Sequence, residues 1–81
     1  MNETKLLLCN RVKYLRKIKK LTQAQLAEKL DLSINYVSQI ERGIATPTFQ
    51  TLEGLAKGLE VSLKTLFDFE ATINKSSNSN D

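Results

Sequence analysis

The sequence contains no histidine and a single cysteine, Cys9, among its 81 residues. Without histidine there is no imidazole to act as a general base or to bind a metal. One cysteine forms neither an internal disulfide nor a zinc site, and we expect Cys9 to be a small packing residue. The acidic residues are scattered, and no glycine-rich phosphate loop is present. These absences argue against an enzyme and predict no metal and no cofactor.

Long apolar runs are also missing. The stretch Leu6-Leu7-Leu8-Cys9 is too short for a signal-peptide core, and nothing approaches the length of a membrane span. A lone cysteine fits a reduced, cytoplasmic protein. The hydrophobic fraction of 41% and the charged fraction of 26% are typical of one small globular domain. We place this domain at residues 1–73 and expect residues 74–81, rich in Asn and Ser, to form a disordered polar tail.

Charge is distributed unevenly along the chain. Residues 1–45 carry nine basic and four acidic side chains, whereas residues 46–81 carry three basic and five acidic ones. A positive half is the mild electrostatic signature of a protein that binds a polyanion.

The first predicted helix, residues 5–19, would bury Leu8, Val12 and Leu15. Most of its basic residues should be solvated, with some facing phosphate: Lys5, Arg11, Lys13, Arg16, Lys17, Lys19 and Lys20. Arg16 differs, because on a helical wheel it lies about 40° from Val12, beside the core. Glu41 has the same angle to Val37 on a later helix. We expect the two charges to pair; the alternative is that both side chains turn to water.

The central stretch, residues 22–43, reads as two short helices joined by a tight turn. Thr22 and Gln25 have the spacing of a capping box, and Ser33 can cap the second helix. Asp31 lies in the turn between the helices, and Gly43 suits the left-handed residue that closes many helices.

The second of these helices has two different faces. Val37, Ile40 and Glu41 lie together on one side. The opposite side is a polar arc with Ile34 and Tyr36 at its margins, and it contains Asn35, Ser38, Gln39 and Arg42. Amides, a hydroxyl and an arginine suit hydrogen bonds to base edges and phosphates. From this helix alone, an ordinary solvated face is an equal alternative.

Two further helices are predicted after the loop that contains Pro47. Thr48 caps the first of them, whose apolar side would pack on the core through Phe49, Leu52, Leu55, Ala56 and Leu59. Ser62 caps the last helix, which carries Leu63, Leu66 and Phe67.

Several of these residues together resemble the lambda-repressor-like, Xre-type helix-turn-helix family. The pattern consists of Leu21-Thr22-Gln23, Leu26-Ala27, Ser33, Ile40-Glu41-Arg42-Gly43 and Pro47, within a resemblance that runs from Val12 to Phe67. The chain departs from it at Asp31 and Glu60, where many members have glycine. Asp tolerates the left-handed conformation better than Glu does.

The resemblance implies an all-α, compact five-helix DNA-binding domain with the helix-turn-helix at its second and third helices. It implies a sequence-specific transcriptional regulator that binds double-stranded DNA with the third helix in the major groove. Implied base contacts are Ile34, Asn35, Tyr36 and Gln39. Implied phosphate contacts are Gln23, Ser33, Ser38, Arg42, Thr46, Thr48 and the amide of Phe49. It also implies that Arg16 and Glu41 form a structural ion pair.

Members of this family commonly bind (pseudo)palindromic operators as homodimers. We expect Leu66, Phe69 and Ile73 to supply the apolar part of the dimer interface; alternatively, Phe69 folds back on its own core. No small-molecule ligand is expected. An antitoxin or adaptor of the same fold, acting mainly on a partner protein, is the alternative function. At this level a controller protein, a prophage repressor and an antitoxin look alike.

Overall fold

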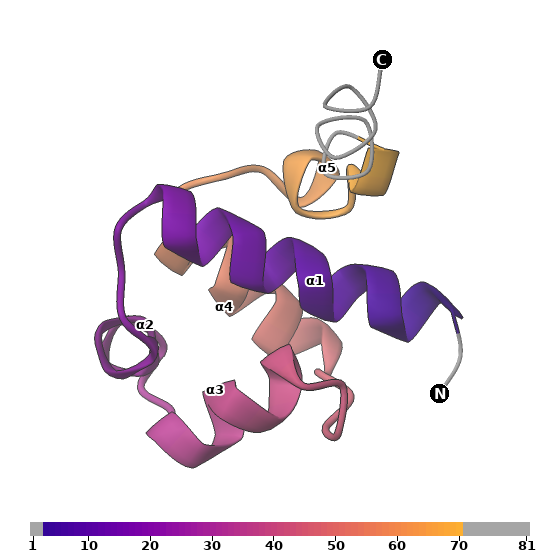
Figure 1. Cartoon of the computed structure of the whole chain (residues 1–81). Helices are drawn as coiled ribbons and strands as arrows, with labels where there is room; N and C mark the ends of the chain where they lie inside the picture. Colours follow the sequence, from indigo (N-terminus) through magenta and orange to yellow (C-terminus); the bar gives the residue numbers. More distant parts are fainter. Residues whose placement is uncertain (1–2, 71–81) are drawn as a thin grey trace.

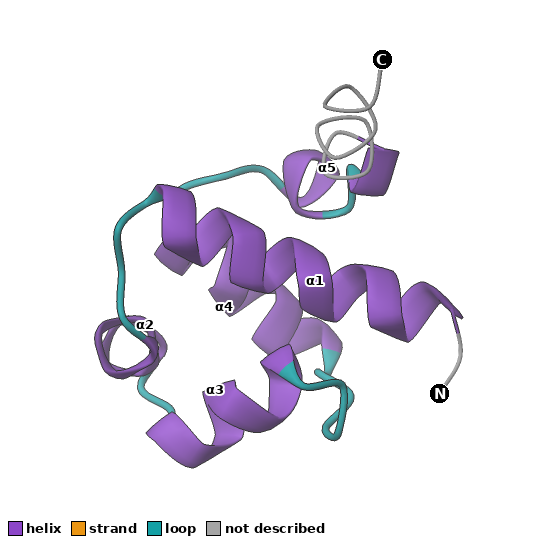
Figure 2. Ribbon diagram, viewed as in Figure 1, coloured by secondary structure: helices purple, strands orange, loops and turns teal. Residues whose placement is uncertain are grey.

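The computed structural model describes residues 3–70. The predicted polar tail and Ile73 lie outside the described residues, so the structure does not test them. As predicted, helices are the only regular secondary structure of the described residues: α1 (Glu3–Ile18), α2 (Gln23–Leu30), α3 (Ile34–Glu41), α4 (Phe49–Leu59) and α5 (Leu63–Leu66). In Figures 1 and 2, α1 crosses the middle of the molecule, with α3 on one side of it and α5 on the other. No helix within residues 3–70 is long and apolar enough to cross a membrane.

Each helix from α2 to α5 begins at a hydroxyl residue that the sequence identified. The caps Thr22, Ser33, Thr48 and Ser62 each accept a hydrogen bond from a backbone N–H three residues later. At α2 the capping box is complete, because Gln25 Oε1 also accepts from the Thr22 N–H at 2.8 Å. These local bonds satisfy amides that a helix cannot pair internally, and they therefore set where each helix begins.

The ends of α1 to α4 share one geometry. One or two residues after the end of each helix the backbone is left-handed, at Lys20 (φ 59°), Asp31 (φ 57°), Gly43 (φ 75°) and Glu60 (φ 60°). The next N–H reaches back to the carbonyl five residues earlier, as in Leu32 N to Ala27 O at 2.9 Å. This is the Schellman motif. Glu60 therefore adopts the conformation that glycine commonly supplies, despite its side chain.

The core lies between α1 and the other helices. It is built from Val12 and Leu15 of α1 together with Leu26, Ala27, Val37, Ile40, Leu55, Ala56, Leu59 and Leu66. Helices α2 and α4 approach closely at Gly58, where an added Cβ would lie 2.4 Å from Leu30 Cδ1. A side chain at this position would therefore require Leu30 to move.

Two predictions about individual side chains are wrong, and Arg11 is an exception to the expectation that most basic residues of α1 are solvated. Phe49 does not pack on the core: it is 87% exposed. It is the first residue of α4, and side chains of a helix tilt toward its N-terminus, so the ring projects past the helix end. Leu66 is fully buried in the core, so its side chain exposes no surface that could form a dimer interface. Arg11 is not solvated but 4% exposed, because its guanidinium binds the Thr65 carbonyl.

Candidate nucleic-acid interface

The outer face of α3 carries the polar arc that the sequence predicted. Asn35 and Arg42 are exposed, and Ser38 and Gln39 are half-buried. Val37, Ile40 and Glu41 of the same helix are buried on the opposite face. At the first position of α3, Ile34 is 53% exposed, whereas Tyr36 is half-buried and packs against the core. Ile34 and Asn35 are therefore more accessible to a ligand than Tyr36 is, whereas Gln39 is half-buried like Tyr36.

Ser33 has a structural role in addition to its predicted phosphate contact. Its Oγ accepts the Tyr36 N–H at 3.0 Å and so begins α3. A hydroxyl that accepts one hydrogen bond still has its own hydrogen to donate. Ser33 can therefore cap the helix and donate to an anion at the same time.

The N-terminus of α2 carries several hydrogen-bond donors. The capping box satisfies the N–H groups of Thr22 and Gln25. Within residues 3–70 no acceptor reaches the backbone N–H of Gln23 or Ala24, as is usual in a first helical turn. Gln23, the first residue of the helix, is half-buried. This end of α2 therefore offers backbone donors and a side-chain amide close together.

Beneath these surfaces lies an ion pair between α1 and α3. Arg16 Nε is 2.6 Å from Glu41 Oε2, and Arg16 Nη2 is 3.0 Å from Glu41 Oε1. The Arg16 and Glu41 side chains are 11% and 1% exposed. Arg16 Nη1 also donates to the Leu21 carbonyl at 2.8 Å. The predicted pair is thus present as a buried, two-pronged interaction that fixes α3 on α1.

The loop between α3 and α4 carries the remaining predicted phosphate contacts. Thr46 and Thr48 are exposed. The Thr48 hydroxyl accepts the Thr51 N–H at 3.1 Å and donates to Thr51 Oγ1 at 3.1 Å. Unlike Ser33, Thr48 would have to give up its own hydrogen bond to Thr51 in order to donate to a phosphate.

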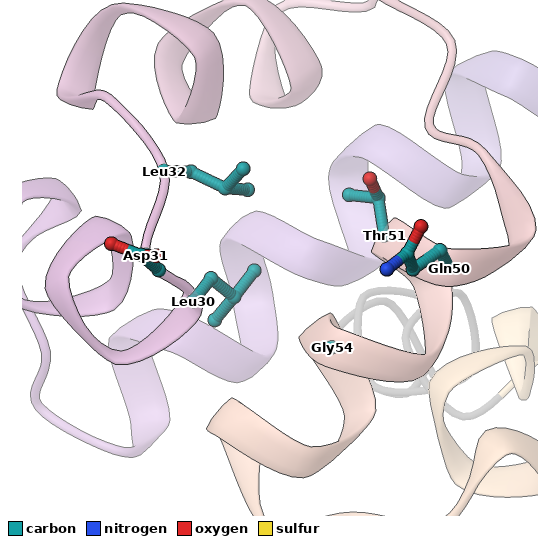
Figure 3. A pocket seen from close by; sticks show the side chains of 6 residues that line it. All are labelled: Leu30, Asp31, Leu32, Gln50, Thr51 and Gly54. Atoms are coloured by element: carbon teal, nitrogen blue, oxygen red, sulfur yellow. The ribbon is translucent and has the colours of Figure 1, made fainter.

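A separate groove between α2 and α4 contains none of the predicted contact residues. It has a volume of about 360 Å³ and is lined by Leu30, Asp31, Leu32, Gln50, Thr51 and Gly54. Figure 3 shows Leu30 between the two helices, on the side of the groove where Gly54 lies. The groove adds no charged cluster to the polar face of α3.

An apolar patch on α4 and α5 was not recognised in the sequence, which assigned Phe49 and Leu52 to the core and placed Leu63 and Phe67 on the last helix. The patch consists of Phe49, Leu52, Leu63 and Phe67, and Glu53 and Lys64 border it. Phe49 is 87% exposed, Leu63 47% and Phe67 45%. Phe69, which is half-buried, stacks on Phe67 with ring centroids 5.8 Å apart. Amphipathic periodicity marks such residues as apolar but does not say which of them another helix covers.

Comparison with known proteins shows that this chain is similar to proteins named as repressors and transcriptional regulators. The family model described as "Helix-turn-helix" matches residues 12–66. The chain is 43% identical over 63 residues to the immunity repressor protein of Bacillus phage phi105, covering 78% of this chain and 44% of the relative. It is 42% identical to the transcriptional regulator SinR of Bacillus subtilis, covering 72% of this chain and 53% of the relative. The chain thus spans about half the length of these relatives.

Controller proteins are similar over most of their length. The control protein C.BamHI of Bacillus amyloliquefaciens is 36% identical, with 84% of this chain and 85% of the relative covered. Among solved structures, the wild-type restriction-modification controller protein C.Esp1396I matches with a TM-score of 0.80 at 35% identity, covering 85% of this chain and 88% of the other. The C.Esp1396I tetramer in complex with its natural operator matches with a TM-score of 0.79, covering 84% and 90%.

Proposed function

We propose, from the premise that this chain belongs to the helix-turn-helix family, that it is a transcriptional regulator that binds specific sequences of double-stranded DNA. The observation that carries this proposal is the exposed polar face of α3 beside the donor-rich N-terminus of α2. An α-helix fits the major groove of B-DNA, where base edges present hydrogen-bond donors and acceptors. The similarity to an operator-bound controller protein supports the same function.

Different parts of this surface serve different roles. Asn35 and Gln39 are one helical turn apart, so their amides can reach neighbouring base edges. Ile34 can contact a thymine methyl, and Tyr36 can add to that contact from the margin of the face. The phosphate contacts are Gln23, Ser33, Ser38, Arg42, Thr46, Thr48 and the amide of Phe49. Phosphate contacts fix the register of the protein on the duplex, and base contacts supply specificity.

The regulator acts as a homodimer that joins through the apolar patch. One helix reads only a few base pairs, and a two-fold dimer reads two half-sites. The patch suits a second copy of this chain because two residues of opposite charge, Glu53 and Lys64, border it. In a two-fold interface, Glu53 of one protomer can face Lys64 of its partner. Phe69 contributes by supporting Phe67.

The test of DNA binding uses fluorescence anisotropy with a duplex selected from a random library and with a scrambled duplex. We expect the selected duplex to bind at least about a thousandfold more tightly. We also expect the affinity for both to fall steeply as salt rises, because bound cations are released from the phosphates. Weak binding that is the same for every sequence would contradict a sequence-specific regulator. It would favour the antitoxin or adaptor alternative.

A further inference from the structure

The side chain of Gln23 is held from inside the protein. Its Nε2 donates to Glu41 Oε1 at 3.1 Å. The same carboxylate accepts two hydrogen bonds from Arg16, at 2.6 and 3.0 Å. Glu41 is 1% exposed, and α1, α2 and α3 meet at this network. The ion pair is therefore connected to a residue that the proposed function places on a phosphate.

The hydrogen bond to Glu41 selects one of the two orientations of the Gln23 amide. An ionised carboxylate only accepts hydrogen bonds, so the amide nitrogen must face it. In the opposite orientation the amide oxygen would lie against the carboxylate, and two acceptors would repel each other. The nitrogen bonded to Glu41 keeps a second N–H, and Gln23 is only half-buried, so part of this residue is open to solvent or a ligand.

This second N–H lies at the end of α2 where the backbone N–H groups of Gln23 and Ala24 have no acceptor within the described residues. A phosphate oxygen accepts hydrogen bonds, and it is also attracted to the positive end of a helix dipole. A glutamine whose rotamer is already fixed loses less side-chain entropy when it binds than a free one does.

We propose that Glu41 is a positioning residue for DNA binding: it holds the Gln23 amide with its nitrogen as donor, so that this nitrogen and the first amides of α2 bind one phosphate. The proposal rests on the proposed function. Arg16 acts indirectly: its two hydrogen bonds fix the Glu41 carboxylate, which in turn holds Gln23. Glu41 thus connects the packing of α3 on α1 to a contact made by α2.

A double-mutant cycle tests this link. The parent, Gln23→Met, Glu41→Gln and the double variant are titrated against the selected and scrambled duplexes. Each is measured at a temperature where circular dichroism shows it fully folded. We expect Gln23→Met to weaken binding about fivefold, the worth of one net hydrogen bond. Binding to the two duplexes should weaken equally, since a phosphate contact carries no sequence information. Glu41→Gln should weaken binding to a similar extent. The double variant should bind no more weakly than the weaker-binding of the two single variants.

Additive effects of the two changes would overturn the inference and leave the proposed function standing. If the parent binds neither duplex, the inference and the proposed function both fail. Because Glu41→Gln can unfold the domain, Arg16→Met/Glu41→Met provides a second background in which the ion pair is removed as a unit. In that background Gln23→Met should cost less than about twofold, well below the loss expected in the parent. An undiminished loss there would also overturn the inference.

The free protein gives an independent readout. In nuclear magnetic resonance spectra, one side-chain amide proton of Gln23 should be shifted downfield in the parent and lose that shift in Glu41→Gln. Gln50 is the matched control, because it is an exposed glutamine in the first turn of α4. Gln50→Met should leave DNA affinity unchanged. Gln23 resonances in the parent that match those of Gln50 would show that Glu41 does not hold the amide.

Discussion

The guanidinium of Arg11 binds the backbone carbonyl of Thr65 through Nε at 3.1 Å and Nη2 at 2.8 Å, across 54 residues of sequence. The same guanidinium lies over the Tyr14 ring, 5.6 Å from its centroid. Arg11 is 4% exposed, so this is a buried charge bonded to the last turn of α5. The short helix that carries Leu63 and Phe67 is therefore attached to α1 by a cation as well as by the burial of Leu66.

Replacing Arg11 should loosen this attachment. We expect Arg11→Met to lower the free energy of unfolding by about 1.5–3 kcal/mol, because the hydrogen bonds from a charged group to the Thr65 carbonyl are lost. Urea denaturation followed by circular dichroism measures the change. Lys17→Met is the control, since Lys17 is exposed on the same helix. Equal losses in the two variants would show that Arg11 contributes no more than a surface cation.

Neutralising Glu41 should be far more damaging than neutralising an exposed glutamate. Glu41→Gln leaves the buried Arg16 without a counter-charge, which costs about 3 kcal/mol or more. This is a large share of the stability of so small a domain. Glu28→Gln, exposed on α2, is the control. Thermal melts of both variants make the comparison, and similar midpoints would mean that solvent screens the pair.

Glu60 should be replaceable with a gain in stability. Its backbone is left-handed at φ 60°, which strains a residue with a Cβ and does not strain glycine. We expect Glu60→Gly to raise the free energy of unfolding by about 1 kcal/mol. The same chemical change at Glu28, inside α2, should lower it by about 1 kcal/mol. Urea titrations of both should therefore show opposite signs, and a loss at Glu60 would contradict the strain argument.

The apolar patch should control dimerisation. We expect Phe49→Ala/Phe67→Ala to raise the dimer dissociation constant at least about tenfold, because aromatic anchors dominate interface energies. Leu6→Ala/Ile18→Ala is the matched control: these residues of α1 are 45% and 51% exposed and lie outside the patch. Sedimentation velocity over a concentration series gives both constants. An unchanged dimer in the first variant would remove the patch from the interface.

Base reading and phosphate binding should separate at Gln39 and Arg42. Gln39→Ala should relax sequence preference at one or two positions of each half-site, losing about 1–3 kcal/mol of discrimination. The salt dependence of binding should hardly change. Arg42→Ala should weaken all sequences alike and flatten the salt dependence, since it removes a cation. Anisotropy titrations with single-base variants of the selected duplex distinguish the two. An equal loss on selected and scrambled DNA for Gln39→Ala would assign Gln39 to phosphate.

The helices themselves could be predicted because the determinants are local. Thr22, Ser33, Thr48 and Ser62 each bond an amide three residues away, so the sequence alone specifies where α2 to α5 begin. The Arg16–Glu41 pair could also be anticipated, because a helical wheel places both charges beside buried positions. The family pattern reinforced both expectations.

Only the tertiary structure decided which residues of a given type face inward. Arg11 and Lys17 are both basic residues of α1, yet α5 covers only the first of them. Phe49 and Leu66 both fit apolar stripes, yet Phe49 projects past the end of α4 and Leu66 enters the core. The partner of Gln23 belongs here too, because Glu41 is 18 residues away and reaches Gln23 only after α2 and α3 pack. Periodicity specifies the faces of one helix, whereas burial and pairing depend on which other helices pack against that face.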